Sequence, residues 1–447
     1  MATKTKRIFF SILASLLAVV TVVLAIRAVL NYTGGRKLAA YLEKAEADGV
    51  AMKMKDLVPD CPDSDNGAPL WKAAEALIQI ENKDKGPLSR AIQDFFNGRS
   101  PDIETRRLLA ALVEKNRRVL DLMVESSKRT CFRYQDWSRP AYEATFLGAV
   151  NLIQATRLLA IDAVLRADNG DIRRALDHCL AGMSFNRLLL DEPFLIKGLI
   201  ALTDMKICLI ALNRIMSGRE VPPDVLTSWM EELDPLAWRQ RFARILPGER
   251  AFALEAGLNL VRGNPEATRA FTETRFLDRL WTWLTRPMIK SELIWVQRHY
   301  EDLKDLPALS YYQIRERLEE HGRQINLLPW YCRVIGGLLP DYQSTFMKEA
   351  TLEAMMLATK VGLACKIYKN KTGSYPESLE ALVPEYLSEV PVDPFTGKPF
   401  VFRLSDDEIL IYSFGSNGKD DAGRGTYLID KMVMEKDDDW TWREKVR

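Results

Sequence analysis

The segment ADNGDIRRALDHCLAG, residues 167–182, decides the fold class of this chain. Its centre, Asn169-Gly170-Asp171, interrupts a helical pattern, and Asp171 is placed to cap the helix that follows. The helix before this turn has an apolar stripe made up of Leu152, Leu159, Ala163 and Val164. The helix after it has a facing stripe made up of Ile172, Ala175, Leu176, Cys179 and Met183. This spacing predicts a pair of antiparallel helices over residues 143–190.

The hairpin resembles the helix–turn–helix unit of tetratricopeptide-like repeats. The sequence has no second copy at a fixed period, so a repeat solenoid and a non-repetitive helical bundle both stay open. The helical period extends over residues 69–345, which we expect to form a helical body. Ser100 is expected to cap one of its helices, with Pro101 as the first helical residue. Further helices are expected near residues 201–216, 223–232, 249–261 and 305–321.

A transmembrane anchor is predicted near the N-terminus. Residues 8–26 read IFFSILASLLAVVTVVLAI, a run of 19 residues without a charge. At 1.5 Å of rise per residue this run is about 28 Å long, close to the thickness of a bilayer core. Basic residues in the preceding segment 1–7 favour a cytoplasmic N-terminus, a span over 8–30 and export of the rest of the chain. A cleaved signal peptide is the alternative, since Val23 and Ala25 fit a small-residue cleavage pattern.

Residues 31–68 are expected to be a stalk and an irregular entry segment. Gly34 and Gly35 follow the apolar run, and turn-forming residues crowd the stretch 59–67. Trp281, Trp283 and Trp295 lie farther along the body. Tryptophan favours membrane interfaces, but the charges interspersed among these residues favour ordinary packing in a core or groove.

The C-terminal part begins with a helical stripe from Leu352 to Ile367 and continues GSYPESLEALVPEYLSEVPVDPFTGKPFVF. Alternating segments 400–404 and 409–414 predict strands, with a third strand near 426–429. An acidic, glycine-rich loop, 415–421, lies between them. Residues 346–434 are expected to form a module, and 435–447 a charged tail. The whole chain is therefore expected to be α+β and predominantly α.

The module resembles the globular head of type II secretion major pseudopilins. The residues that match are Tyr375, Pro376, Leu379, Leu382, Pro384, Pro391, Asp393, Pro394, Gly397, Pro399, Tyr412, Ser413, Gly415 and Gly418. The resemblance implies a small helix-plus-antiparallel-sheet head. The N-terminus lacks the family's Gly-Phe cleavage site and the glutamate of its apolar helix. In its combination of anchor, helical body and head, the chain is similar to a group of uncharacterised membrane-anchored proteins from planctomycete-type bacteria.

The resemblance also implies a calcium site in the loop after the second strand. Carried over to this chain, the ligands are Asn417, Asp420 and Asp421, with Asp430 as a distant candidate. Acidic loops with glycine turns supply the oxygen ligands that calcium requires. A solvated acidic turn is the alternative interpretation of the same residues.

Composition excludes some functions. The net charge is +1, from 62 basic and 61 acidic residues that are interspersed, which argues against nucleic-acid binding. The six cysteines lack zinc-site spacing; they allow disulfides without specifying a pairing, and burial as free thiols is expected for most of them. The sequence has no HExxH, GxSxG, Walker or GxGxxG motif, and its three histidines have no partner that the sequence assigns.

These observations favour a non-enzymatic interaction or structural protein of the bacterial cell envelope. We expect a single pass through the inner membrane, a periplasmic or otherwise extracytoplasmic body, and an envelope protein as partner. The alternative is an envelope hydrolase whose site in the helical body is silent in the sequence. A deep cleft with convergent carboxylates or histidines would favour the hydrolase, and a shallow groove would favour binding.

Overall fold

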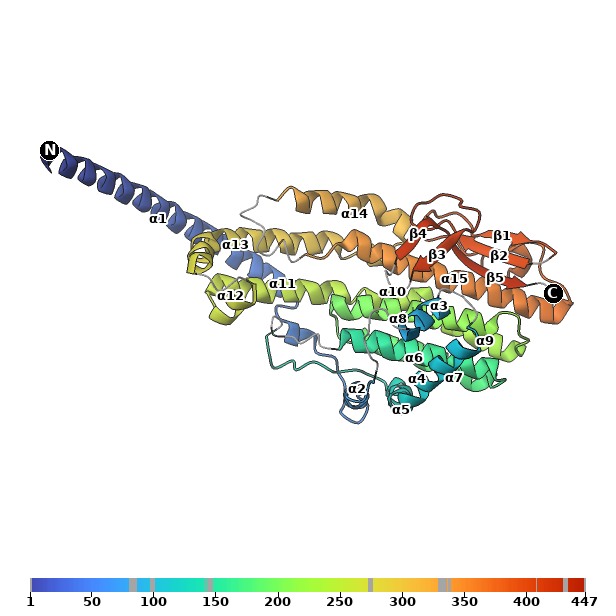
Figure 1. Cartoon of the computed structure of the whole chain (residues 1–447). Coiled ribbons are helices and arrows are strands. Elements are labelled where there is room, and N and C mark those ends of the chain that lie inside the picture. The colour runs from blue at the N-terminus through green and yellow to red at the C-terminus, as the bar shows by residue number, and fades with distance from the viewer. Residues whose placement is uncertain are drawn as a thin grey trace.

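The structure is a computed structural model of the whole chain. It describes residues 2–79, 87–96, 101–140, 143, 148–271, 276–328, 336, 339–406, 408–428 and 433–445. A long N-terminal helix projects from an elongated bundle of helices, and a small sheet lies at the opposite end of the molecule (Figure 1). The expected α+β, predominantly α fold is confirmed.

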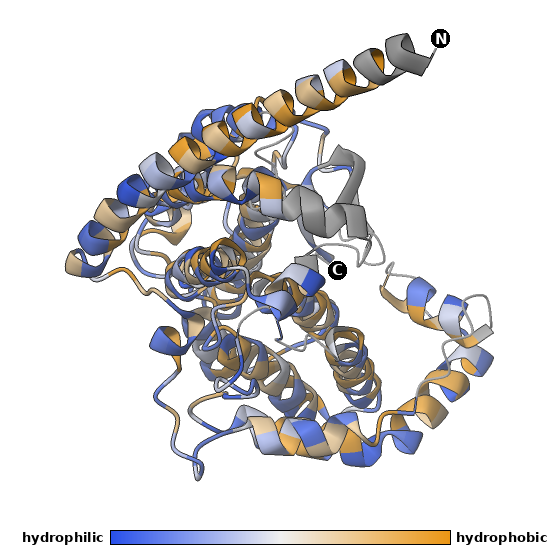
Figure 2. Ribbon diagram, turned by 90° about the vertical axis from the view of Figure 1, so that its left-hand side faces the viewer, coloured by the Kyte–Doolittle hydropathy of each residue, from blue (hydrophilic) through white to orange (hydrophobic). Residues whose placement is uncertain are grey.

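The projecting helix, α1 (Ala2–Ala47), is longer than the predicted anchor. It continues through Gly34 and Gly35, so residues 31–47, expected to be a stalk, are helical. Gly34 allows α1 to approach α13 closely, because a β-carbon there would lie 3.3 Å from the carbonyl oxygen of Pro287 in helix α13. The apolar outer half of α1 stands clear of the body (Figure 2) and is long and apolar enough to cross a membrane.

The body contains most of the helices. They are η1 (Met54–Leu57), α2 (Ala68–Glu75), α3 (Pro87–Phe96), α4 (Ile103–Lys115), α5 (Arg117–Ser127), α6 (Ala149–Asp168), α7 (Ile172–Leu189), α8 (Leu195–Met216), α9 (Pro223–Glu232), α10 (Pro235–Phe242), α11 (Ile245–Arg262), α12 (Pro265–Phe271), α13 (Phe276–Leu303), η3 (Leu306–Ala308) and α14 (Tyr311–Asn326).

The predicted hairpin is present as α6 and α7, which pack against each other and against α8. Asp171 caps α7 as expected, and its Oδ1 accepts a hydrogen bond from Arg174 N at 3.3 Å. The prediction for α4 was wrong in detail. Asp102, not Ser100, is its cap, and Pro101 lies outside the helix, because the Asp102 carboxylate accepts a hydrogen bond from Thr105 N at 2.7 Å. Ser100 itself lies outside the described residues.

The C-terminal head is built on helix α15 (Tyr342–Thr372), which Asp341 caps at its N-terminus and Gly373 ends with a φ of 87°. Next along the chain are η6 (Glu380–Leu382) and the strands β1 (Val401–Leu404), β2 (Glu408–Ser413), β3 (Gly425–Leu428), β4 (Val433–Asp438) and β5 (Trp440–Lys445). An antiparallel sheet has the order β1-β2-β5, and β3 pairs with β4 in a separate ribbon.

The prediction of a charged tail over residues 435–447 was therefore wrong. Residues 433–445 form two strands, and β5 pairs with β2 along its whole length. The physical reason is that alternate residues of β5 point into the molecule: Trp442 is buried, Arg443 is exposed, and Glu444 is buried against Lys366 of α15, with 2.7 Å between Oε1 and Nζ. The side chains of α15 also contact α8 and α9, so one continuous hydrophobic core joins body and head.

Candidate functional site

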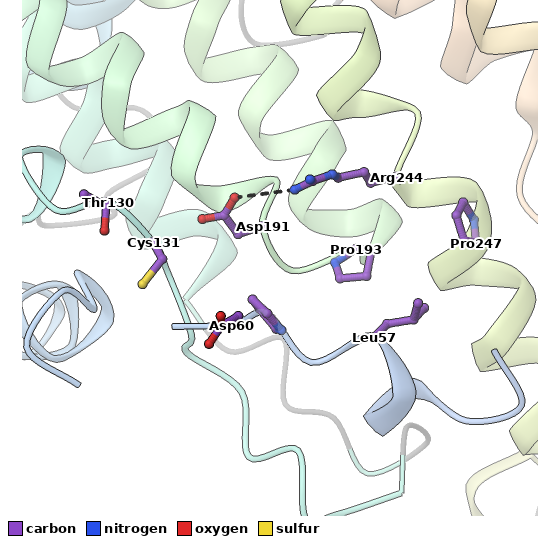
Figure 3. A pocket seen from close by; sticks show the side chains of 9 residues that line it. Leu57, Asp60, Thr130, Cys131, Asp191, Pro193, Arg244 and Pro247 are labelled. Carbon is purple, nitrogen blue, oxygen red and sulfur yellow. Dashed lines mark ion pairs between the residues drawn. The ribbon is translucent and has the colours of Figure 1, made fainter. Parts of the chain in front are cut away.

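A groove of about 440 Å³ opens on the side of the helical body (Figure 3). Four segments that are far apart in the sequence form it: the end of η1 with the chain after it, the chain after α5, the turn between α7 and α8, and the start of α11 with the residue before it. Its lining residues are Leu57, Pro59, Asp60, Thr130, Cys131, Asp191, Pro193, Arg244 and Pro247. We call it the proline groove, because three prolines form much of its wall.

A disulfide fixes one side of the proline groove. Cys61 and Cys131 are bonded, with their Cα atoms 5.6 Å apart. Asn66 reinforces this junction: its Oδ1 accepts a hydrogen bond from Arg133 N at 2.9 Å, and its Nδ2 donates to the Arg133 carbonyl at 3.1 Å. The sequence left the pairing open. The other cysteines that the structure describes, Cys179, Cys208 and Cys365, are free and buried.

Two successive acidic residues, Asp191 and Glu192, hold the irregular segment after Cys131. Asp191 Oδ2 accepts a hydrogen bond from Phe132 N at 3.2 Å. Glu192 Oε1 accepts hydrogen bonds from Tyr134 N at 3.1 Å, Gln135 N at 2.8 Å and Trp137 Nε1 at 3.2 Å. Backbone donors of a segment without regular structure are thereby satisfied inside the protein, as buried donors must be.

Glu192 also forms a buried ion pair with Lys197 of α8. The ammonium group lies 5.1 Å from the centre of the Tyr134 ring and 5.7 Å from that of Phe132. Burial lowers the pKa of Lys197, against the opposing effect of Glu192. Removing one partner of such a pair would leave an isolated buried charge, so the pair contributes to holding the segment 134–137 beside the groove.

Asp191 gives the groove its charge pattern. Its Oδ1 lies 3.7 Å from Arg241 Nη1 and 4.0 Å from Arg244 Nη1. Burial raises the pKa of Asp191, and the two guanidinium groups offset this only in part. Both arginine side chains are largely exposed, at 47% and 63%. Because Asp60 also lines the groove, two carboxylates accompany these two cations, and it is the exposed guanidinium groups of Arg241 and Arg244 that are accessible to a ligand carboxylate.

The groove also contains the ingredients of acid–base chemistry. Asp60 lines it together with Asp191, and Figure 3 shows the two carboxylates on different segments of the wall. Two carboxyl groups in different environments are the arrangement that glycoside hydrolases use. However, Asp191 is already bonded to a backbone N–H, and none of the nine lining residues is a histidine.

A second charged cluster is buried where body and head meet. Arg239 of α10 is ion-paired with Glu353 of α15, and Glu349 lies one turn earlier on the same helix. Burial, together with the neighbouring Glu353, raises the pKa of Glu349. Glu353 and Arg239 also line a cavity of about 540 Å³. Because its ionisable groups face one another between packed helices, we assign this cluster to joining the two parts.

The three histidines have partners that the sequence did not reveal. His178 Nδ1 lies 2.8 Å from Asp162 Oδ2. Burial raises the pKa of Asp162, but its contacts with His178 and two arginines prevail and lower it to about 2. His299 and His321 face each other with 3.1 Å between their Nδ1 atoms, and burial with the neighbouring His321 lowers the pKa of His299 to about 4. None of these histidines lines the proline groove.

The predicted calcium ligands Asn417, Asp420 and Asp421 lie together in the loop after β2. Their side chains form hydrogen bonds with one another and with neighbouring protein groups. Asn417 Nδ2 donates to Asp421 Oδ2 at 2.8 Å. Asp420 Oδ1 accepts hydrogen bonds from Tyr412 Oη at 2.9 Å and Ala422 N at 2.8 Å. Asp430 lies outside the described residues. Within the part of the chain that the structure describes, no group of three or more His, Cys, Asp or Glu side chains is placed to hold a metal ion.

Asp439 is a residue of this region that sequence reasoning missed. It is buried, and its Oδ2 accepts a hydrogen bond from Gly423 N at 2.8 Å. Burial and the nearby carboxylates of Asp421 and Asp420 raise the pKa of Asp439 to about 6. Calcium binding by this loop therefore stays a prediction that rests on the resemblance to pseudopilins.

The proline groove had one signal in the sequence. Asp191 and Glu192 stand at the C-terminal end of α7, where the helix dipole disfavours negative charge. Acidic residues in such a place indicate a specific tertiary role, here the anchoring of residues 132–137. The pairing of Cys61 with Cys131, across a separation of 70 residues, had no such signal.

No protein-family model matches this chain, and neither does any curated protein or solved structure.

Proposed function

We propose that the chain is a non-enzymatic, membrane-anchored interaction or structural protein of the bacterial cell envelope. In this proposal α1 crosses the inner membrane once, the N-terminus is cytoplasmic, and the body and head lie outside the cytoplasm. The exposed apolar half of α1 supports the anchor. The Cys61–Cys131 disulfide supports the compartment, because disulfides persist in oxidising environments and are rare in the cytosol.

The proline groove supports the binding role, and it is the observation that carries the proposal. Its walls are held by a disulfide, by the buried Glu192–Lys197 pair and by close packing of Gly248, whose added β-carbon would lie 1.7 Å from the Pro193 carbonyl oxygen. A preformed apolar wall reduces the entropy that binding must overcome. Exposed Arg241 and Arg244 at the rim favour an envelope protein that presents an extended segment with a carboxylate.

The head is proposed to act as a second binding module. Its helix and antiparallel sheet support the resemblance to pseudopilin heads at the level of element order alone. The head packs on the body through α15, so we propose that the two parts present their surfaces in one fixed orientation. Protein or calcium is the proposed ligand of the head.

Topology is tested with a reporter fused after the C-terminus. A reporter that is active only outside the cytoplasm should be active in this fusion. Replacing Leu17 and Val20 by arginine should release the protein from the membrane, because each central charge costs roughly 2.5–3.5 kcal/mol on insertion scales. Activity of a cytoplasm-specific reporter in the same fusion would refute the proposed orientation.

The binding role is tested in intact cells with a photoreactive amino acid at Thr130, on the wall of the groove. A discrete cross-linked protein is expected, and Arg244→Glu should abolish it by reversing the charge of the rim. Arg107→Glu on α4 is the matched control, since it makes the same charge change at an exposed position outside the groove. Equal cross-linking in both variants would exclude the groove as the partner site.

The hydrolase remains the second candidate, favoured by the presence of Asp60 and Asp191 in one groove. It predicts that the purified chain cleaves envelope glycans and that Asp60→Asn and Asp191→Asn each abolish the cleavage. Cleavage that needs both carboxylates would replace the binding proposal. Cross-linking at Thr130 that persists in Asp60→Asn, with no cleavage by the wild-type chain, would support binding.

A further inference from the structure

Helix α1 is fastened to α13 at the point where its apolar run ends. The guanidinium of Arg27 lies 3.8 Å from the centre of the Trp283 ring, and Arg27 Nε donates to the Trp283 carbonyl at 3.2 Å. Lys290 Nζ donates to Asn31 Oδ1 at 2.8 Å and to the Asn31 carbonyl at 3.1 Å. Figure 1 shows α13 running alongside α1 where α1 leaves the body.

This junction gathers positive charge. Arg27, Arg286 and Lys290 lie close enough for the charge of Arg27 to act on the other two. Burial, and then the charge of Arg27, lowers the pKa of both Arg286 and Lys290. None of the three forms an ion pair with a carboxylate among the residues that the structure describes. Such unneutralised cations attract anions.

The same junction exposes aromatic rings. Trp283 is 37% exposed, with its ring beside Arg27, whereas Trp295 is half-buried against His299. Tyr32, five residues after Arg27 on α1, is 66% exposed. The side chain of Trp281 lies outside the described residues. Tryptophan and tyrosine beside cations at the end of an apolar span are typical of the membrane–water interface.

We propose that Arg27, Arg286 and Lys290, with Trp283, bind the phosphate headgroup of an anionic phospholipid and hold the body against the membrane surface. The occupant is a lipid because the site begins one residue after the apolar run 8–26, at headgroup depth. This inference rests on the proposed membrane anchoring. We call these four residues the headgroup cluster.

Native mass spectrometry of the detergent-solubilised full chain tests the headgroup cluster. Phosphatidylglycerol and phosphatidylcholine are titrated separately, and the fraction of protein that retains lipid is measured. We expect saturable retention of phosphatidylglycerol and about tenfold weaker retention when Arg27, Arg286 and Lys290 are all changed to glutamine, since each juxtamembrane cation attracts anionic lipid. The matched control changes Lys55, Arg107 and Lys115, three exposed cations outside the cluster, to glutamine.

A second measurement guards against loss of folding: the circular dichroism spectrum and the melting curve of the triple-glutamine variant should match those of the control variant. Equal binding of both lipids by the wild-type chain, or equal losses in the cluster and control variants, would overturn the proposal. Competition by free glycerol phosphate as strong as by the lipid would also overturn it. Separately, wild-type chain that an alkaline wash removes from cell membranes would refute the anchoring itself.

Discussion

The indole ring of Trp442 lies directly against Gly362, so that a β-carbon at position 362 would come within 2.2 Å of Cε2 of the ring. Gly362 lies in the middle of α15, and Trp442 lies on the last strand, β5. Trp442 therefore completes the core of the head. Glycine at position 362 leaves the space that the indole ring occupies.

Gly362→Ala should destabilise the full chain, although alanine is the better helix former. The added methyl group cannot fit without moving a large buried ring, and overpacking of this kind costs roughly 1–3 kcal/mol. Gly322→Ala on α14 is the matched control, because a β-carbon there meets no atom within 4 Å. It should stabilise by about 0.5–1 kcal/mol. Thermal melting of both variants in detergent measures the difference, and equal shifts would contradict the packing.

Removing the disulfide should lower stability substantially. In the chain-entropy model a closed loop of the 70 residues that separate Cys61 from Cys131 contributes about 4 kcal/mol. We expect Cys61→Ala plus Cys131→Ala to lower the free energy of unfolding by about this amount, measured by urea denaturation. A reductant should lower the stability of the wild-type chain and leave the double variant unchanged. A reductant effect of equal size on both would show that the bond does not contribute.

How much of this fold the sequence predicts depends on the range of the interactions. The hairpin of α6 and α7 follows from local signals, namely an apolar period of three and four residues and the cap Asp171. The apolar run of α1 is equally local. The continuation of α1 through Gly34 and Gly35 was not predictable, because adjacent glycines disfavour a helix locally and the packing of α1 involves α13, about 250 residues away in the sequence.

The last strand and the groove show the limit more clearly. From the sequence, Glu444 reads as one of the charges of an exposed tail. In the structure it pairs with Lys366, which lies 78 residues earlier in the sequence. The proline groove joins four segments between Leu57 and Pro247 that no motif links. Sequence patterns report which face of an element is apolar, but they do not report which elements meet. The proline groove is formed where such elements contact one another, so the sequence alone does not predict it.

Stability should depend on pH through Asp204, which is buried in α8. Thr156 Oγ1 donates to its Oδ2 at 2.9 Å, and burial raises its pKa to about 7, from 3.8. Between these values the folded chain holds a proton that the unfolded chain has released, so the free energy of unfolding falls as pH rises from about 4 to 7. Asp204→Asn should remove this loss and stabilise the chain at pH 8 by roughly 1–4 kcal/mol.

Urea denaturation at pH 5 and pH 8 measures the Asp204 effect. Other groups also titrate in this range, so the informative quantity is the difference in pH dependence between wild type and variant. Asp177→Asn, an exposed position on α7, is the matched control and should leave the pH dependence unchanged. If Asp204→Asn has the same pH dependence as the wild type, the buried carboxyl group is ionised in the folded chain and the assignment is wrong.

Calcium should raise the melting temperature of the full chain if the loop after β2 binds it, as the resemblance to pseudopilins predicts. Asp420 and Asp421 supply few charges, and Asp420 already accepts two hydrogen bonds, so weak binding in the micromolar to millimolar range is expected. At one hundred times the dissociation constant, binding to the folded state alone adds about 2.7 kcal/mol. Asp420→Asn plus Asp421→Asn should abolish the shift between calcium and chelator, and Asp406→Asn, in the exposed turn between β1 and β2, should preserve it. Melting curves that are identical with calcium and with chelator would leave the loop as an acidic turn, and a shift that survives the double change would place the ion elsewhere.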